Sequence, residues 1–293
     1  MKEFLIVFVT SLILSIPVHA KHRALLVGVG DYPSASGWQK INSANDVSLL
    51  APAMQRRGFV VTKLLDNKAT KTGIVAAIKR LTSQSGAGDC VWLHFSGHGQ
   101  QVEDHNGDEP DGLDEAFVCY DAHRYYSKTY RGQNHLLDDE LNPLLVALRK
   151  RLGAKGKLLV TIDACHSGDS YRASGDNVVT DTLVGLRRGV NDVLAKHSPY
   201  VRRKPSSPMR LTPLKRSQGY AAVALLAACQ PNECNYEYIE PGSKRSYGAL
   251  SYMLWEAMNA SMRRSDVMAI AHWVMKYNTA YMRKYQHPHL FEE

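Results

Sequence analysis

The sequence predicts an α/β fold in which a mostly parallel central sheet is flanked by helices. Apolar runs of strand length alternate with segments whose apolar residues recur at helical spacing, which is the order of elements in such folds. Several runs are apolar throughout, as expected for strands covered on both faces. A chain of 293 residues, 44% of them hydrophobic, is long enough to bury one large core around this sheet.

Continuous apolar runs mark the expected strands. Most are bounded by glycine, aspartate or serine, which favour turns. The run after Lys157 stops abruptly at Asp163 and leads into a Ser-Gly turn. A strand that ends in this way holds its last residues rigidly at the sheet edge where α/β folds bind ligands. The expected strands are residues 23–30, 59–65, 89–95, 157–163 and 221–228.

Helical periodicity after a capping residue marks the expected helices. In the clearest case Thr70 precedes an apolar stripe that includes Ile74 and Ile78, and such a stripe faces a core. No regular element is expected between Asp169 and Tyr220. The expected helices begin at Asn42 or Ser43, at Thr70, and at Asp138 or Asp139, with two more over about 247–262 and 266–285.

The first 20 residues have the features of a secretory signal. Lys2 precedes an apolar run over residues 4–16, and Val18-His19-Ala20 has the small-x-small pattern of a cleavage site. The alternative is a membrane anchor, but this run is shorter than the ~20 residues that span a bilayer. We therefore expect residues 1–20 to be a signal peptide. The protein would be exported, to the periplasm or the medium, without stable membrane insertion.

The number of cysteines in an exported chain bears on its disulfides. Five cysteines cannot all pair within one chain, and so few in 293 residues leave stability to the hydrophobic core. Cys229 and Cys234 are close enough in sequence to form a disulfide, but the pattern also allows all five to be reduced. If a disulfide forms, we expect Cys165 to be the free thiol.

The net charge of +8 belongs to one segment of the chain. Residues 185–217 contain nine lysines and arginines and a single acid, so the rest of the chain is formally neutral. A nucleic-acid binder would carry such charge on a folded face with interleaved aromatics, so we expect no nucleic-acid partner. Four prolines in the segment indicate an exposed linker. It separates a large part, residues 21–184, from a small part, residues 218–293.

Two expected strands end in polar turns that contain glycine. His98 lies in Ser96-Gly97-His98-Gly99, and Cys165 follows the strand that ends at Asp163. The carboxyl ends of parallel strands meet at one edge of a sheet, so the turns face each other if the strands are neighbours. An imidazole within reach makes a thiol nucleophilic. Either residue alone would be a packing residue or a strand cap, but together they predict a Cys–His dyad.

These two turns resemble the signature of a known family. Ser96-Gly97-His98-Gly99 and Asp163-Ala164-Cys165-His166-Ser167-Gly168 are similar to the motifs of the caspase–haemoglobinase group of cysteine peptidases, and specifically of the metacaspases. Residues 225–229 and 247–252 resemble the small-subunit core of that family. Caspases have Gln-Ala-Cys at the nucleophile, whereas this chain has Asp-Ala-Cys-His. The resemblance implies a caspase–haemoglobinase-like fold and a cysteine-type endopeptidase, which we expect to be a monomer.

The resemblance also implies a role for each residue of the dyad. His98 would be the general base and acid and Cys165 the nucleophile, with no cofactor required for the chemistry. His166, beside the nucleophile, would have a structural role. Glycine next to a catalytic histidine lets the backbone approach the substrate and exposes N–H groups. We therefore expect Gly99 to help bind the oxyanion.

The position of Asp163 indicates which substrates to expect. It lies two residues before Cys165, so both side chains are expected on one face of the strand. A carboxylate in the adjoining pocket selects arginine or lysine, with arginine favoured by bidentate pairing; the alternative is that Asp163 only caps the strand. The resemblance implies the same pocket, lined also by Asp46 and Ser96. We expect peptide or protein substrates with Arg or Lys before the cleaved bond.

The basic linker has an expected role in processing. Members of the family are often cut between their large and small parts, and an enzyme specific for basic residues would find many sites in this segment. Arg188, Lys204 and Arg216 are candidates that the sequence does not rank. The alternative is a solvated linker that is not processed.

An acidic segment, residues 99–122, holds eight acids and no lysine or arginine. Part of it has EF-hand spacing, but Glu109 replaces the required glycine and no helices flank the loop, which excludes an EF-hand. The residues with that spacing are Asp104, Asn106, Asp108 and Glu115. A solvated acidic loop is one interpretation of the segment.

The other interpretation is a calcium activator, which the resemblance implies. The matching ligands would be Asp114, Asp138 and Asp139. The family usually has a further acid seven residues past the nucleophile, where this chain has Arg172, and Asp169 would have to replace it. This departure leaves both interpretations open.

Two other functions are consistent with the sequence. One is a related peptidase that cuts after Asn or Asp, which would require different acids in the pocket. The other is a non-catalytic or regulatory caspase-like protein, which would be marked by loss of His98 or Cys165. Both residues are present, so an endopeptidase specific for Arg or Lys is the leading hypothesis.

Overall fold

The computed structural model describes residues 20–104, 106–107, 112–165, 184–188, 218–230, 233–260, 266–277 and 286–293. The expected signal peptide, apart from its last residue, lies outside these ranges. No helix within them is long and apolar enough to cross a membrane.

In chain order the elements are β1 (His22–Gly28), η1 (Ser34–Ser36), α1 (Ser43–Arg56), β2 (Phe59–Leu65), η2 (Asp66–Lys68), α2 (Lys71–Gln84), β3 (Cys90–Ser96), β4 (Gly99–Glu103), β5 (Leu113–Val118), β6 (His135–Leu137), α3 (Asp138–Leu152), β7 (Lys157–Asp163), β8 (Val184–Arg187), β9 (Ala222–Ala227), β10 (Tyr236–Ile239), β11 (Ser246–Gly248), α4 (Ala249–Asn259), α5 (Val267–Lys276) and β12 (His289–Glu292).

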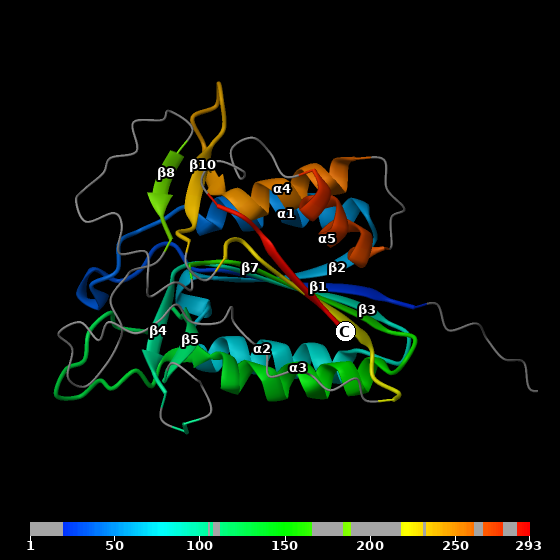
Figure 1. Ribbon diagram of the computed structural model, residues 1–293, viewed down its shortest axis with the longest axis horizontal. Coiled ribbons are helices and arrows are strands. Elements are labelled where there is room, and N and C mark those ends of the chain that lie inside the picture. Colours follow the sequence, from blue (N-terminus) through cyan, green and yellow to red (C-terminus); the bar gives the residue numbers. More distant parts are fainter. Residues whose placement is uncertain are drawn as a thin grey trace, which may run out of the picture.

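The centre of the molecule is a six-stranded sheet in the order β12-β9-β7-β3-β1-β2. All neighbouring strands are parallel except the edge strand β12, which runs antiparallel to β9. Helices α2 and α3 cover one face, and α1, α4 and α5 cover the other (Figure 1). The predicted α/β fold with a mostly parallel sheet flanked by helices is therefore confirmed.

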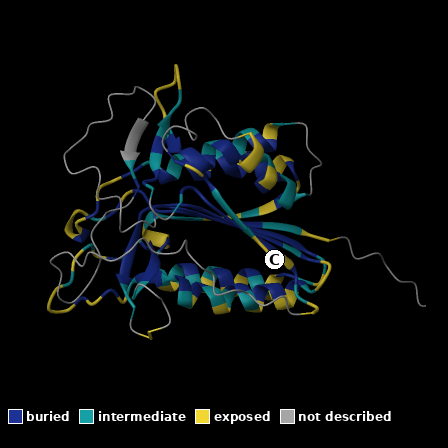
Figure 2. Ribbon diagram, in the orientation of Figure 1, coloured by how far each residue is buried: buried dark blue, intermediate teal, exposed yellow. Residues whose placement is uncertain are grey.

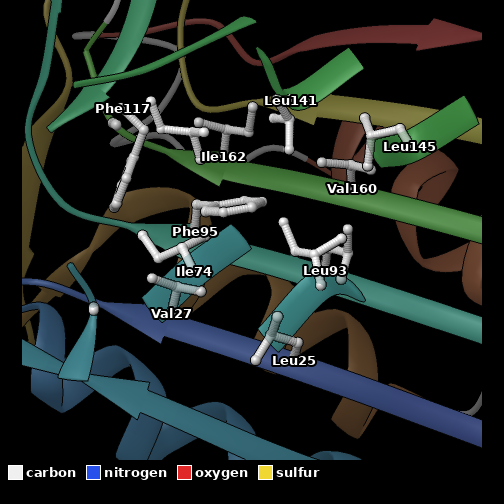
Figure 3. Close-up of a cluster of buried hydrophobic side chains, with 14 of the residues drawn as sticks. Leu25, Val27, Ile74, Leu93, Phe95, Phe117, Leu141, Leu145, Val160 and Ile162 are labelled. Atoms are coloured by element: carbon white, nitrogen blue, oxygen red, sulfur yellow. The ribbon is translucent and has the colours of Figure 1, made fainter. Parts of the chain in front are cut away.

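Alternation of side chains along each strand gives the sheet two cores. In β1, Leu25 and Val27 belong to the cluster on the α2–α3 face, whereas Ala24 and Leu26 belong to the cluster on the α1–α4–α5 face, as the period of two requires. Figure 3 shows the first cluster, in which Leu93 and neighbouring strand residues meet Ile74 of α2 and Leu141 of α3. The strands are consequently the most buried layer of the molecule (Figure 2).

Several predicted boundaries are confirmed, and one expected cap has another role. The Thr70 hydroxyl accepts a hydrogen bond from the Gly73 N–H (3.1 Å) and begins α2. Asn42 precedes α1 but makes no side-chain cap. Its amide instead donates to the carboxylate of Glu237 (2.7 Å), because a buried charge competes for the donor more strongly than a helix end does.

Short strands escaped prediction. The sheets β11-β10-β8 and β4-β5-β6 contain strands of three to six residues, too short for a clear alternating pattern. The start of the expected exposed linker is also wrong. Residues 184–187 form β8, and Arg188 is fully buried, because partners elsewhere in the fold surround its charge. Linker residues 189–217 lie outside the described ranges.

The sheet places the two glycine turns side by side. Strands β3 and β7 are parallel neighbours, with Ser96 opposite Asp163 at their last register position. The Gly97 N–H donates to the Asp163 carbonyl (3.3 Å), so pairing continues beyond the strand ends. The expectation that these two strands are neighbours is confirmed. His98 and Cys165 therefore leave the same edge of the sheet from adjacent strands.

Three buried histidines are held neutral. Burial lowers the pKa of His94 and His98 from 6.5 to about 4, and that of His135 from 6.5 to about 3. His135 lies between the Tyr130 hydroxyl (2.8 Å) and the Gln100 side-chain oxygen (2.9 Å). These partners suit a neutral imidazole that donates from one nitrogen and accepts at the other.

These pKa values predict loss of stability in mild acid. The unfolded chain binds protons on the three histidines near pH 6.5, whereas the folded chain binds them only near pH 4 or below. Their contribution is complete above pH 6.5 and is lost as the pH falls towards 4. Urea unfolding between pH 7.5 and 4.5 should show this decline, and His135→Gln should make it shallower. An equal slope in the variant would contradict the assignment; comparing slopes separates the histidine from carboxylates that titrate in the same range.

Candidate functional site

Cys165 lies just beyond β7 and is 1% exposed. Its sulfur lies 3.7 Å from the Glu233 carbonyl oxygen and accepts the Asn235 N–H at 3.4 Å. Its own N–H donates to the Arg188 carbonyl oxygen (2.8 Å). A sulfur that accepts a backbone N–H is better able to carry a negative charge. The environment of Cys165 is thus suited to a thiolate as well as to a thiol.

His98 is oriented by a backbone carbonyl. Its Nε2 lies 2.7 Å from the Gln39 carbonyl oxygen, which can only accept, so Nε2 carries the proton. The neutral ring then has a lone pair on Nδ1, and that atom is buried without a hydrogen-bond partner among the described residues. Burial lowers the pKa of His98 to about 4, opposed by the Gln39 hydrogen bond and by the charge of Cys165. His98 and Cys165 therefore interact electrostatically, although no hydrogen bond joins these two described residues.

Two aromatic residues cover His98. The Trp38 ring stacks on the imidazole at 5.1 Å with an interplanar angle of 25°, and Tyr32 packs against it at 5.2 Å. The Tyr32 hydroxyl also accepts the His98 backbone N–H (3.1 Å). Gly97 makes this approach possible, since a Cβ there would lie 2.8 Å from Phe117 and 3.1 Å from the Tyr32 hydroxyl. Sequence reasoning missed Trp38 and Tyr32, because they lie in a segment without periodicity.

The three residues predicted for the substrate pocket lie together, and they surround Arg188. Its Nη1 contacts the Asp46 carboxylate (2.7 Å), the Ser96 hydroxyl (2.7 Å) and, at 3.7 Å, the Asp163 carboxylate. The guanidinium and both carboxylates are completely buried. These three residues therefore form an acidic pocket that holds a residue of the chain's own basic linker, and a role of the pocket in binding substrate stays a prediction.

Each predicted acid has further hydrogen bonds that fix its position. The Ser96 hydroxyl donates to Asp46 (2.6 Å), and the Gly248 N–H donates to the other Asp46 oxygen (2.8 Å). The N–H and hydroxyl of Ser251 both donate to Asp163 (2.7 and 2.6 Å). Gly248 must lack a side chain, because a Cβ would lie 2.1 Å from Asp163.

Sequence reasoning missed a fourth pocket residue, Glu237. It lies on β10, and one of its oxygens is 3.1 Å from Nη2 of Arg188. The backbone N–H and the side-chain amide of Asn42 donate to its two oxygens (2.6 and 2.7 Å). Asn42 and Glu237 are 195 positions apart, and no local signal connects them. The guanidinium is thus contacted through both of its terminal nitrogens.

The backbone of residues 184–188 lies as an added strand beside the site. β8 pairs antiparallel with β10, with Arg187 opposite Tyr236 and Val184 opposite Tyr238. The Arg188 N–H continues the pairing by donating to the Asn235 carbonyl (2.8 Å). β8 and β10 lie at the same end of the molecule as β4 and β5 (Figure 1). This is how proteins bind an extended peptide at a sheet edge: the main chain pairs and one side chain fills a pocket.

Asn235 connects the thiol, the pocket and the added strand. Its side-chain amide donates to Asp163 (2.8 Å), in addition to its backbone contacts with Cys165 and Arg188. The Gln286 amide donates to the Asn235 side-chain oxygen (2.9 Å) and lies 3.1 Å from the Ala228 carbonyl. Both residues are completely buried polar side chains. Their isolated positions in the sequence gave no motif that could have found them.

A cation in the pocket offsets part of the negative charge of three carboxylates that lie close together. Burial alone would lower the pKa of Arg188, but the attraction of Asp46, Asp163 and Glu237 outweighs it and raises that pKa. Burial raises the pKa of Asp46 to about 6 against the lowering effect of Arg188. Removing the guanidinium would leave three carboxylates close together and raise the Asp46 pKa further. The pocket thus has a strong electrostatic preference for a positively charged occupant.

All five cysteines are free thiols and buried, so Cys229 and Cys234 do not form the disulfide that their spacing allows. Cys229 lies beside Cys165, which, together with burial, raises the pKa of Cys229 well above its ordinary value. Cys229 therefore remains protonated near neutral pH. Of the two adjacent thiols, Cys165 is the one suited to act as a nucleophile.

The structure describes four further predicted residues without testing their roles, whereas His166 and Asp169 lie outside the described residues. Gly99 begins β4 directly after His98 and pairs with Phe117. Asp114 lies in β5, and Asp138 and Asp139 begin α3 directly after β6, the neighbour of β5. Within the part of the chain that the structure describes, no three histidine, cysteine or acidic residues form a group that could hold a metal ion. The oxyanion and calcium roles stay predictions.

Comparison with known proteins shows which family the chain resembles. A family model described as the caspase domain matches residues 21–291. Metacaspase-1 of Mycosarcoma maydis is 27% identical over 271 residues, covering 83% of this chain and 63% of the relative. Metacaspase-2 of Arabidopsis thaliana is 35% identical over 161 residues, covering 52% and 36%. Metacaspase-1A of Aspergillus niger is 30% identical over 203 residues, covering 64% and 47%. The chain thus spans between about a third and two thirds of the length of these relatives.

A solved structure agrees on the fold. Protein GSU0716 from Geobacter sulfurreducens superposes with a TM-score of 0.60 at 23% sequence identity, over 93% of each chain. This likeness concerns the fold alone. Because the family model covers nearly the whole chain and the three relatives named above are metacaspases, the chain belongs to the caspase domain family and is of the metacaspase type.

Proposed function

We propose that the protein is a cysteine endopeptidase that cleaves after arginine, and less readily after lysine, with Cys165 as nucleophile and His98 as general base and acid. The observation that carries the proposal is Arg188, whose side chain fills the acidic pocket while its carbonyl oxygen lies 2.8 Å from the Cys165 N–H. This is the position of a residue that precedes a cleaved bond. The metacaspase relatives support the same reaction class.

The proposed reaction uses groups whose positions are described above. Nδ1 of His98 takes the proton of the Cys165 thiol, and the thiolate attacks the carbonyl carbon of the substrate arginine. The Cys165 N–H stabilises the oxyanion, and the predicted second donor is Gly99. The protonated His98 then gives its proton to the leaving amine. Water hydrolyses the acyl-enzyme with His98 again as base, which restores the thiol.

The preference for arginine follows from the two contacted nitrogens. Asp46 and Ser96 hold Nη1, and Glu237 holds Nη2. A lysine ammonium is a single point charge and cannot occupy both positions. An aspartate or asparagine side chain would place a further acceptor among three carboxylates. The alternative specificity for Asn or Asp is therefore disfavoured.

We further propose that the chain cleaves itself between Arg188 and Gly189. Of the three candidates in the linker, Arg188 lies in the pocket, whereas Lys204 and Arg216 fall outside the described residues. The strand β8 holds Arg188 in the antiparallel pairing of a bound peptide. An uncut strand in this position would block the site, so cleavage and release of the strand would make room for other substrates.

Export and calcium activation remain part of the proposal as expectations from the sequence. Neither takes part in a step of the proposed reaction.

Removing the charge of one pocket carboxylate should strongly lower the peptidase activity. Removing one partner of a buried ion pair costs ~3–5 kcal/mol, so Asp163→Asn should lower kcat/KM for an arginine-ending reporter peptide on the order of 10²–10⁴-fold. Cys165→Ala should abolish turnover. Asp266→Asn, which removes a half-exposed ion pair with Lys157, is the control and should act like wild type. Efficient cleavage of aspartate-ending reporters by the unmodified protein would refute the assignment.

Glu237 should set the preference between arginine and lysine. Its carboxylate contacts Nη2 of the guanidinium, a position that a lysine ammonium held at the Nη1 position does not fill, so Glu237→Gln should lower kcat/KM for arginine more than for lysine. We expect the arginine-to-lysine ratio to fall roughly tenfold, the worth of about 1.4 kcal/mol. Glu240→Gln, at the end of β10 and bonded to the Ser243 hydroxyl, should leave the ratio unchanged. A ratio that is equal in wild type and Glu237→Gln would exclude this role.

Self-cleavage should produce one new N-terminus at Gly189. Sequencing of fragments from the purified full chain should detect it, and the rate should not depend on protein concentration if cleavage is intramolecular. Cys165→Ala and Arg188→Gln should leave this bond intact. Arg187→Gln, one residue earlier in β8, is the matched control and should still be cut. Cutting only after Lys204 or Arg216, or an identical fragment from Cys165→Ala, would exclude the assigned bond.

A further inference from the structure

A second thiol lies beside Cys165 and has no part in the proposed reaction. Cys229 follows β9 by two residues and is 4% exposed. β9 is the neighbour of β7, with Ala227 opposite Ile162, and the Ala228 N–H donates to the Ile162 carbonyl (3.0 Å). Neighbouring strands lie about 4.8 Å apart. Cys165 and Cys229 therefore leave the same sheet edge from adjacent, still paired chains.

The two sulfurs lie close together on one acceptor. Each lies 3.7 Å from the carbonyl oxygen of Glu233, and Cys165 is the largest cause that raises the pKa of Cys229. A disulfide needs Cα atoms within about 7 Å and sulfurs brought to about 2.05 Å. Residues that emerge from adjacent paired strands with their thiols close together meet the first condition, and rotation of the two side chains can supply the second.

The two thiols have different surroundings, so that one can react with a peroxide first and the other can then attack the oxidised sulfur. Cys165 has the Asn235 N–H on its sulfur and the imidazole of His98 nearby, so it is the thiol that becomes a thiolate and reacts with a peroxide first. Cys229 lies buried against it as a protonated thiol, positioned to attack an oxidised Cys165. Cys90, at the opposite end of β3, and Cys119, just beyond β5, lack a comparable contact with either thiol among the described interactions.

We propose that Cys165 and Cys229 form a reversible disulfide when the protein meets a peroxide, and that this disulfide switches the peptidase off. The inference rests on the proposed role of Cys165 as nucleophile. The Cys165 sulfur attacks the peroxide, a sulfur–oxygen bond forms as the oxygen–oxygen bond breaks, and one water leaves. The Cys229 sulfur then displaces the hydroxyl of the sulfenic acid, and the thiol proton leaves with it as a second water. Two thiols have given two electrons, and a dithiol reductant returns them.

The pair would also protect the nucleophile. A sulfenic acid without a neighbouring thiol is oxidised further to a sulfinic acid, which thiol reductants do not reverse. With Cys229 close by, the first oxidation product is captured as a disulfide. The position of Cys229 beside Cys165 therefore accounts both for the loss of activity in peroxide and for its recovery with a dithiol reductant.

The test is peroxide treatment of the full chain, using hydrogen peroxide, followed by alkylation and peptide mapping by mass spectrometry. We expect loss of two free thiols, a linked peptide pair containing Cys165 and Cys229, and loss of reporter cleavage in step with the linked pair. Dithiothreitol should restore both thiols and cleavage. Cys229 and Cys234 fall in one tryptic peptide, so fragmentation must separate them. A Cys229–Cys234 link in place of the expected one, or no link, would overturn the proposal.

Variants give an independent measurement. Cys229→Ser should still lose activity in peroxide, but the fraction recovered with dithiothreitol should fall several-fold as Cys165 goes on to the sulfinic acid. Cys119→Ser, a buried thiol elsewhere in the fold, is the control and should recover like wild type. Equal recovery in Cys229→Ser and wild type would reject the switch; Cys229→Ala serves if the serine variant does not fold. A disulfide in a protein that never cleaves arginine reporters would support the pairing and overturn the proposed function.

Discussion

The buried guanidinium of Arg188 is the interaction on which the rest of the site depends. A charge removed from water is tolerated only with close, well-bonded partners, and here three carboxylates from distant parts of the chain supply them. Asp46 comes from the first helix, Asp163 from the end of a central strand, and Glu237 from a short strand in the small part. The occupant of the pocket therefore also joins the large part of the domain to the small part.

The pocket acids are positioned by donors that cannot move independently of the fold. Main-chain N–H groups of Gly248 and Ser251 hold Asp46 and Asp163, and Asn42 holds Glu237 at the start of the first helix. Such rigid donors keep three like charges together even though their mutual repulsion disfavours it. The cost is offset only while a cation occupies the pocket. This explains why a basic residue of the chain itself is drawn into the site.

Two groups of residues at the sheet edge lie beside the strand formed by residues 184–188. The ends of β3 and β7 present His98 and Cys165, while β10 and Asn235 pair with the main chain of residues 184–188. Gln39 fixes the tautomer of His98 through a carbonyl group, and Asn235 touches the sulfur, the pocket and the strand. The proposed reacting groups thus come from the core of the large part, and the backbone proposed to bind substrate comes from the small part. Cys229, at the end of β9, lies where these two regions meet.

The amino-acid sequence was enough to predict the α/β fold, the strands that end near Ser96 and Asp163, and the grouping of His98, Cys165 and Asp163 at one edge of the sheet. These features are local: apolar runs, glycine turns and the alternation of side chains specify them, and parallel strands necessarily end together. The folded structure was needed to show that Arg188 fills the pocket, that Glu237 and Asn235 line it, and that Trp38 and Gln39 hold His98. Those contacts join residues up to about 200 positions apart, and they arise from the packing of short loops and strands that have no periodic pattern. The burial of Arg188 could not be predicted for the same reason, since a lone arginine in a basic segment is ordinarily solvated, and only the three carboxylates that folding assembles make its burial favourable.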